Sequence, residues 1–288
     1  MPPPQRTQYP TGHEAWRWVI TDDGSRTLWD ARLDETYHSG CGAVAETLIV
    51  YLWHSGVLER LRQRQSTTVL EYGLGTGTGL LLTAALAEHY QTPLRFISLE
   101  QFLLPTSILQ QLDLPTAAAG CLAGDFARTP ELDPGLLIEE LHALGALSDS
   151  FCTAVERWTR SGEQGWCAHK LSDFVELQLW LGDACQWRVA DNHAGHDMHA
   201  RPDTDIPSAV FPGSCDAVYF DPFSPDTHPE LWTLPVFHNA ALALRPGGRL
   251  TSYCVKSVVR RGLQAAGLQV AKGAGPIGGK REVLIASR

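Results

Sequence analysis

An aspartate that follows an apolar run is the residue of this sequence best placed for proton chemistry. The run Cys215-Asp216-Ala217-Val218-Tyr219-Phe220 is typical of a buried strand, and Asp221 comes directly after it. Open α/β sheets bind their ligands at the carboxyl ends of the strands. A carboxylate at that edge could accept a proton from a substrate and orient it. The alternative is a structural role, because Asp often caps turns through its side-chain oxygen.

A glycine-rich turn is the second feature that could serve chemistry. The β-branched and apolar residues 67–72 predict a buried strand, and the alanine-rich run 80–87 predicts a helix. Gly73, Gly75 and Gly77 lie between them at alternate positions. Strand, glycine turn and helix form the first unit of a nucleotide-binding α/β domain. Glycine lets a ligand lie against bare main chain. A tight turn in any α/β protein is the alternative.

Two further acidic residues end predicted strands. Leu94–Leu99 is followed by Glu100, roughly 20 residues past the glycines, where an acid is expected to bind ribose hydroxyls. A solvated surface carboxylate is the alternative for Glu100. Val175–Leu181 alternates as a strand and ends at Gly182-Asp183. Asp183 could contact an adenine amino group, or it could cap a helix.

The elements that must position these residues can be read from periodicity and turn signals. A β-hairpin is predicted from strands at 16–20 and 27–29, followed by a helix from about Ser39 to Arg62 that either packs on the sheet or forms a lid. Residues 130–175 show helical spacing and predict two helices, the second at about Phe151–Arg160. The remaining predicted elements are helices at 105–112, 229–244 and 258–267, a turn at 245–249, and strands at 250–254, 268–270 and 282–286.

Composition narrows the class of protein. The net charge of −9 does not favour nucleic-acid binding, so such binding would require a local basic patch. The seven cysteines are scattered without a CxxC pair, which indicates neither a disulfide framework nor a zinc site. No stretch is long and apolar enough to span a membrane, and no signal peptide is recognisable, so we expect a cytoplasmic protein. His193, His196 and His199 lie in a predicted polar loop and are not expected to bind metal.

The glycine turn resembles a family signature. Glu71 followed by Gly73, Gly75 and Gly77 is similar to the first motif of class I S-adenosylmethionine (SAM) methyltransferases, in which the glycines pack against the methionine part of the ligand. Further segments, taken in order, resemble the methyltransferase domains of the MnmC family, which act on the tRNA wobble uridine. These segments are Tyr37-His38-Ser39 with Glu46, Leu179–Asp183, Asp221–Pro225, Pro229–Trp232, Val259–Leu263 and Gly279–Glu282.

The resemblance implies a fold and a domain organisation. The fold is a Rossmann-like α/β methyltransferase with a mostly parallel twisted sheet, helices on both faces, an antiparallel last strand and an N-terminal β-hairpin. Residues 1–66 would form an N-terminal extension with the hairpin and the lid helix. Residues 67–288 would form the methyltransferase domain, with a helical insertion at about 130–175. The flavin oxidoreductase half of the bifunctional family members is expected to be absent, as are flavin and metal.

The resemblance also implies a function and a set of site residues. We expect SAM-dependent methylation of the aminomethyl nitrogen of a modified wobble uridine, with tRNA as substrate and a separate oxidoreductase or other wobble-uridine enzyme as a partner. Asp221 would be the catalytic base, because an aminomethyl group must lose a proton before its nitrogen can attack. The expected cofactor-binding residues are Glu71, Gly73, Gly75, Gly77, Glu100 and Asp183. The expected substrate-binding residues are Tyr37, Ser39, Glu46, Phe223, Lys256, Arg260, Arg261 and Lys280, with Phe223 stacking on a base and Lys256, Arg260, Arg261, Lys280 and Arg281 available for phosphate contacts.

Other functions remain open from the sequence. Aminopropyltransferases of the spermidine synthase type share the fold and also place an Asp after the fourth strand, although their glycine turn differs from Tyr72–Gly77. A small-molecule amine methyltransferase and a binding module without catalysis are further alternatives. Phe223 could also be a core ring, and the basic residues could form an ordinary solvated surface.

Overall fold

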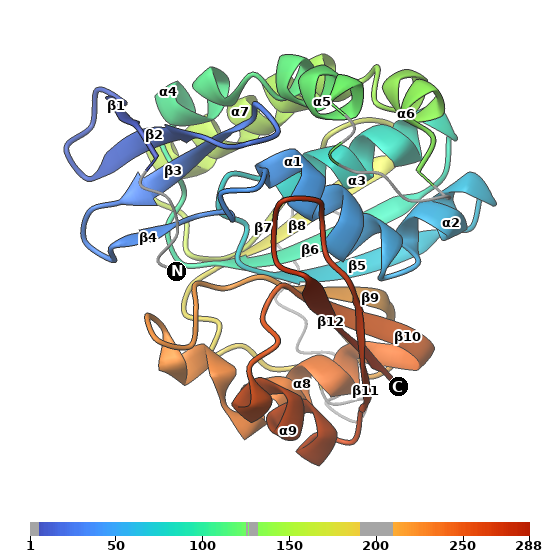
Figure 1. The fold of residues 1–288 in the computed structure, drawn as a ribbon. Coiled ribbons are helices and arrows are strands. Elements are labelled where there is room, and N and C mark those ends of the chain that lie inside the picture. The colour runs from blue at the N-terminus through green and yellow to red at the C-terminus, as the bar shows by residue number, and fades with distance from the viewer. Residues whose placement is uncertain (1–5, 125, 127–131, 191–209) are drawn as a thin grey trace.

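A twisted sheet of eight strands forms the centre of the molecule (Figure 1). The structure is a computed structural model that describes residues 6–124, 126, 132–190 and 210–288. The strand order is β11-β12-β10-β9-β5-β6-β8-β7. The five strands from β10 to β8 in this order are parallel, whereas β7, β12 and β11 pair antiparallel with their neighbours. The strands are β5 (Thr67–Tyr72), β6 (Leu94–Glu100), β7 (Gly165–Lys170), β8 (Val175–Leu181), β9 (Cys215–Phe220), β10 (Leu244–Ser252), β11 (Gln269–Ala274) and β12 (Glu282–Ser287).

Helices cover both faces of this sheet, and each layer has its own apolar core (Figure 1). The helices on one face are α1 (Ala43–Glu46), the π-helix η1 (Thr47–Trp53), α2 (Val57–Arg62), α3 (Thr78–His89), α4 (Thr106–Leu109), α5 (Leu114–Ala123), α6 (Pro134–Glu140) and α7 (Leu144–Ser161), with the short 3-10 turn η2 (Gln110–Leu112) after α4. The other face carries the 3-10 turn η3 (Pro229–Trp232), α8 (Leu234–Ala243) and α9 (Ser257–Ala265). In α7 the buried residues recur at helical spacing, which is why this long helix packs one face on α3.

A second, smaller sheet precedes the domain. It contains four antiparallel strands, namely β1 (Gln8–Pro10), β2 (Trp16–Ile20), β3 (Arg26–Asp30) and β4 (Glu35–Thr36). The turn between β2 and β3 is fixed to the first helix, because Asp23 accepts a hydrogen bond from the Ala45 N–H at 2.9 Å. This hydrogen bond therefore ties the small sheet directly to α1. Thr36 at the end of β4 is followed directly by Tyr37. The small sheet therefore positions the Tyr37 side chain next to the eight-stranded sheet.

The strand order reverses between β5 and β9, and this is where open α/β sheets form their ligand sites. The two strands are parallel and in register, with Tyr72 opposite Phe220. The residues that follow are consequently side by side, and the Asp221 N–H donates to the Tyr72 carbonyl at 3.0 Å. The glycine turn and Asp221 thus meet at the carboxyl edge of the sheet.

The predicted fold class is confirmed, including the N-terminal hairpin, the helices on both faces and the antiparallel last strand. Several local predictions are wrong. The single helix from 39 to 62 is divided into α1, η1 and α2, with Gly56 at a φ of 82° before α2. The two helices expected within 130–175 are present as α6 and α7, but the insertion is not wholly helical, because α7 ends at Ser161 and residues 165–170 form the edge strand β7. Helix α5 was not predicted, and residues 244–252 form one strand with a register shift where a turn was expected at 245–249. The loop with His193, His196 and His199 lies outside the described residues.

Candidate active site

A cavity of about 700 Å³ opens at the switch point between β5 and β9. Its walls come from the small sheet, the glycine turn, the loops after β6, β8 and β9, and the segment between β11 and β12. Seven acidic and two basic side chains line it, so the cavity favours a positively charged ligand. The acidic residues are Asp30, Glu35, Glu46, Glu100, Asp183, Asp221 and Glu230, and the basic ones are Arg32 and Lys280.

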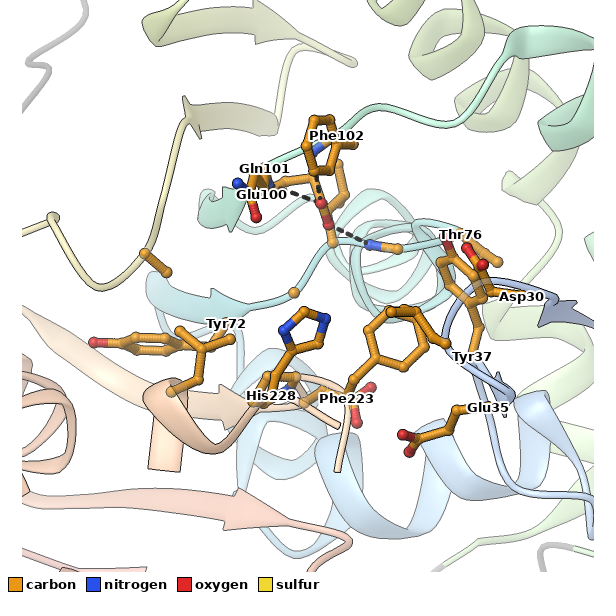
Figure 2. Close-up of a pocket in the computed structure, with 18 of the residues that line it drawn as sticks. Asp30, Glu35, Tyr37, Tyr72, Thr76, Glu100, Gln101, Phe102, Phe223 and His228 are labelled. Atoms are coloured by element: carbon orange, nitrogen blue, oxygen red, sulfur yellow. Dashed lines mark hydrogen bonds between the residues drawn. The ribbon is translucent and has the colours of Figure 1, made fainter. Parts of the chain in front are cut away.

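The glycine turn forms one wall and is held by Glu100 (Figure 2). One carboxylate oxygen of Glu100 accepts a hydrogen bond from the Gly75 N–H at 3.0 Å, and the other accepts from the N–H groups of Gln101 and Phe102. Gly73 has a φ of 90°, and a side chain there would begin 2.9 Å from the Asp221 carbonyl oxygen. This turn therefore requires glycine and presents bare main chain to the cavity.

Asp221 lines the cavity beside the glycine turn and is contacted by a buried tyrosine. The hydroxyl of Tyr51 donates a hydrogen bond to Asp221 Oδ1. Burial, and next the negative charge of Glu46, raise the pKa of the Asp221 carboxyl well above its usual range, whereas Lys280 acts in the opposite direction. Burial also raises the pKa of Glu46, whose carboxylate accepts from the Ser39 N–H at 2.8 Å. Two acids thus share one low-dielectric region beside the cavity.

Aromatic rings form the outer part of the cavity. The ring centres of Tyr37 and Phe223 are 5.0 Å apart in an edge-to-face arrangement, and His228 lies 5.7 Å from Phe223 (Figure 2). Glu35 of β4 fixes the loop that carries Phe223, because its carboxylate accepts hydrogen bonds from the Ser224 N–H and from the hydroxyls of Ser224 and Thr227. The small sheet and the loop after β9 therefore close the site together.

The segment between β11 and β12 brings a lysine to the same place. Lys280 Nζ lies 4.1 Å from the centre of the Tyr253 ring, and the Tyr253 hydroxyl donates to the Pro222 carbonyl at 2.9 Å. A side chain at Gly279 would begin 2.5 Å from Cys41 Sγ, so this segment packs directly against the loop before α1. The positive charge of Lys280 lowers the pKa of both buried acids, against the larger effect of their burial.

The structure brings most of the sequence-predicted site residues together. Those that line the cavity are Tyr37, Ser39, Glu46, Gly73, Gly75, Glu100, Asp183, Asp221, Phe223 and Lys280. Asp183 also caps its own turn, because its Oδ1 accepts from the Cys185 N–H at 2.8 Å.

Five predicted site residues lie outside the cavity lining. Glu71 is buried beneath the glycine turn and accepts from the Ser98 hydroxyl at 2.8 Å. Gly77 faces α7 instead, since a side chain there would begin 2.7 Å from the Phe151 ring. The other three are basic residues at the start of α9 or within it, namely Lys256, Arg260 and Arg261. Lys256 forms an ion pair with Asp226 at 2.5 Å.

Sequence reasoning missed several residues of the site. Tyr253 directly follows β10, so its strand-end position was a usable signal. Phe102, with 75% of its surface exposed, lies two residues after the end of β6 and carried a similar signal. Tyr51 gave no such signal, because it lies within an apolar helical run. Glu35 gave none either, since its role depends on contacts with a loop about 190 residues later in the chain.

The described residues contain neither a membrane-spanning helix nor a cluster of metal-binding side chains. No helix in the described ranges is long and apolar enough to cross the membrane. No group of three or more His, Cys, Asp or Glu side chains in that part of the chain is arranged to hold a metal ion. All seven cysteines are free thiols.

Comparison with known families identifies the class. Residues 147–288 match a family described as S-adenosyl-L-methionine-dependent methyltransferases, designated Methyltransf_30. The sheet order, the glycine turn and the strand-end acids agree with this class. Over residues 147–288 the chain therefore matches the SAM-dependent methyltransferases, and its central sheet has the Rossmann-like arrangement.

Among individual proteins, the chain resembles the methyltransferase part of MnmC. It is 28% identical over 274 residues to the "tRNA 5-methylaminomethyl-2-thiouridine biosynthesis bifunctional protein MnmC" of Cupriavidus metallidurans, covering 93% of this chain and 33% of that protein. The MnmC of Nitrosospira multiformis is 31% identical over 264 residues, with 89% and 34% covered. The crystal structure of MNMC2 from Aquifex aeolicus shares the fold with a TM-score of 0.59 at 23% identity, covering 99% of this chain and 72% of that one. The chain spans about a third of the length of these curated relatives.

The residues around the cavity fit the cofactor of this class. The glycine turn presents bare main chain to the cavity. A Cβ atom at Gly73 would crowd the Asp221 backbone, and one at Gly75 would crowd the Tyr37 ring. The acidic lining suits the positive sulfonium group of SAM, and the cavity volume falls in the range typical of small-molecule sites. We assign Gly73, Gly75, Glu100 and Asp183 to the cofactor side as a proposal.

Proposed function

We propose that the chain methylates the nitrogen of an aminomethyl group on a tRNA wobble uridine, with Asp221 as the base. The observation that carries this proposal is the placement of the Asp221 carboxylate in the cavity wall, directly beside the glycine turn. Tyr51 occupies Oδ1, and Oδ2 has no hydrogen-bond partner among the described residues. This second oxygen is available to a ligand in the cavity.

The chemistry requires a neutral nitrogen. An aminomethyl group is mostly protonated at neutral pH, so the ammonium must lose a proton before its lone pair can attack. Asp221 accepts that proton, which afterwards passes to solvent. When bound, SAM would supply a methyl group already activated on a sulfonium sulfur, so that the N–C bond would form as the S–C bond breaks. Orienting the nitrogen supplies much of the remaining rate enhancement.

The raised pKa of Asp221 is consistent with this role. Burial and Glu46 favour the protonated carboxyl, which makes the ionised form a stronger base than an exposed aspartate. The acidic lining also attracts a substrate ammonium group. These features support an amine substrate.

The nucleic-acid part of the proposal rests on the relatives and on the outer cavity. Curated MnmC proteins are named for 5-methylaminomethyl-2-thiouridine biosynthesis in tRNA. Tyr37 and Phe223 offer ring faces for an unstacked base, as single-stranded RNA recognition commonly requires. Arg260, Arg261 and Lys256 at α9 are candidate phosphate contacts. A separate enzyme that generates the aminomethyl group would then act before this one.

The test is single-turnover methyl transfer to tRNA that bears the aminomethyl group, with saturating SAM. We expect Asp221→Asn to keep SAM affinity and to lose about 100-fold or more in rate, the usual size for removal of a general base. Asp226→Asn is the matched control, because it changes an exposed carboxylate in the same loop. A near wild-type rate for Asp221→Asn would reject the base role.

Turnover with decarboxylated SAM alone would indicate aminopropyl transfer, and turnover of free amines but not tRNA would indicate a small-molecule enzyme.

A further inference from the structure

A rare helical geometry lies behind the cavity wall. Residues 47–53 form the π-helix η1, and the His54 N–H donates to the Ile49 carbonyl five residues earlier at 3.2 Å. Helices with this i→i+5 pattern are uncommon and occur frequently at functional sites. This segment runs directly on from α1, which ends at Glu46.

The π-helical turn aligns two side chains on Asp221. Glu46 and Tyr51 are five residues apart, which in a regular α-helix would place them about 140° apart around the axis. A turn closed by i→i+5 bonds instead stacks such residues on one side. Glu46 and Tyr51 both act on Asp221, the first through its charge and the second through its hydroxyl.

The Tyr51 hydroxyl has no access to the cavity itself. Tyr51 is 2% exposed and does not line the cavity, whereas Asp221 does. Its ring is held against the Tyr219 ring, with 5.3 Å between their centres. Burial and the neighbouring carboxylates raise the Tyr51 pKa well above its usual range, so the phenol stays protonated and donates its proton to the hydrogen bond with Asp221.

We propose that Tyr51 is a positioning residue for the methyl transfer, holding Asp221 Oδ1 so that Oδ2 faces the substrate nitrogen, and that η1 exists in this geometry to deliver it. This inference rests on the proposed function of Asp221 as the base. Tyr51 acts only through Asp221 and touches neither substrate nor cofactor.

The direction of the expected shift in the pH profile follows from the fact that Tyr51 donates the hydrogen bond to Asp221. A hydrogen bond to an ionised carboxylate stabilises the charged form and lowers its pKa. Its removal raises the pKa of Asp221, so the acid limb of the kcat/KM profile moves to higher pH. The groups that face Asp221 from the surrounding elements, and that would stay in place, are Glu46 of α1, Glu71 of β5, Tyr253 after β10 and Lys280 between β11 and β12.

The experiment compares Tyr51→Phe with Tyr219→Phe. Tyr219 is the matched control, because it is an equally buried neighbour whose hydroxyl contacts Thr83 instead of Asp221. We expect Tyr51→Phe to move the acid limb upward by about one pH unit, as expected for loss of one charge-assisted hydrogen bond. SAM affinity should be unchanged, and the profile of Tyr219→Phe should match the wild type.

A second readout separates this inference from the proposed function. The ionisation of Asp221 can be followed by carboxyl ¹³C NMR in both variants, whether or not tRNA is methylated. An upward shift of the Asp221 titration in Tyr51→Phe alone supports the positioning role. An equal titration and an unmoved pH profile in Tyr51→Phe would overturn it, even if the wild type methylates tRNA. An inactive wild type with a shifted titration would instead count against the proposed substrate.

Discussion

The contact between the small sheet and the loop after β9 should control how tightly substrate binds. Glu35 accepts hydrogen bonds from the Ser224 N–H at 3.0 Å and from the Ser224 and Thr227 hydroxyls. Glu35→Ala removes all three. A hydrogen bond to a charged group contributes about 1.5–3 kcal/mol when buried. The site is half-buried, however, and water can replace part of each bond. We therefore expect the free energy of unfolding to fall by about 1–2 kcal/mol in total rather than by three full contributions.

The functional effect should be larger on substrate than on cofactor. Loss of the Glu35 contacts loosens the loop after Phe223, whose carbonyl still accepts from the Trp232 indole, whereas Asp221 stays attached through its own N–H to Tyr72 and through Tyr51. KM for aminomethyl tRNA should rise about tenfold, the equivalent of about 1.4 kcal/mol, while the SAM dissociation constant stays within twofold.

Urea unfolding, calorimetry with SAM and steady-state kinetics test these expectations for Glu35. Glu35→Gln keeps one acceptor oxygen and should recover part of the loss. Glu59→Ala is the control, because Glu59 is exposed on α2 and contacts only Gln63 among the hydrogen bonds described. Unchanged stability together with an unchanged KM in Glu35→Ala would show that the contact is incidental.

Two further variants test the cofactor side and the proposed RNA surface. Gly75→Val should weaken SAM binding strongly in calorimetry, because φ is 53° there and a Cβ atom would lie 3.2 Å from the Tyr37 ring; equal affinity would remove this turn from the cofactor site. Replacement of Arg260 and Arg261 by Ala should lower tRNA affinity in a binding titration and flatten its salt dependence by roughly one unit of slope per lost phosphate contact. An unchanged slope would locate the RNA surface away from α9.

The sequence was sufficient for those parts of the site that depend on local pattern. Buried strands are recognisable in a sequence by their β-branched and apolar residues. The strand ends could therefore be predicted, together with the residues at or just after them: Gly73, Glu100, Asp183 and Asp221. Parallel neighbours place such ends at one edge. Glu71 and Gly77 belong to the same motif, but the structure turns them toward Ser98 and Phe151, away from the cavity.

The parts that could not be predicted depend on contacts between distant segments. The segment 39–62 reads as one apolar helix, and periodicity does not distinguish i→i+4 from i→i+5 bonding over seven residues. Strand β7 was missed because its short run lies beside long helices and is defined mainly by pairing with β8. The basic residues were expected to act together, yet Lys280 enters the cavity while Lys256 pairs with Asp226 at the protein surface.

The chemistry of Asp221 illustrates why a strand-end position alone does not define a base. An exposed aspartate in the same turn would ionise at its ordinary pKa of about 3.9 and would be a weak proton acceptor. Here the helical layer buries the carboxyl, Glu46 opposes its ionisation, and Tyr51 and Lys280 act the other way. Apart from burial, these influences come from α1, η1 and the segment between β11 and β12. Because they partly cancel, a change in any one of them should move the pH dependence without moving Asp221, which makes the pH profile a more specific probe of this site than the rate at a single pH.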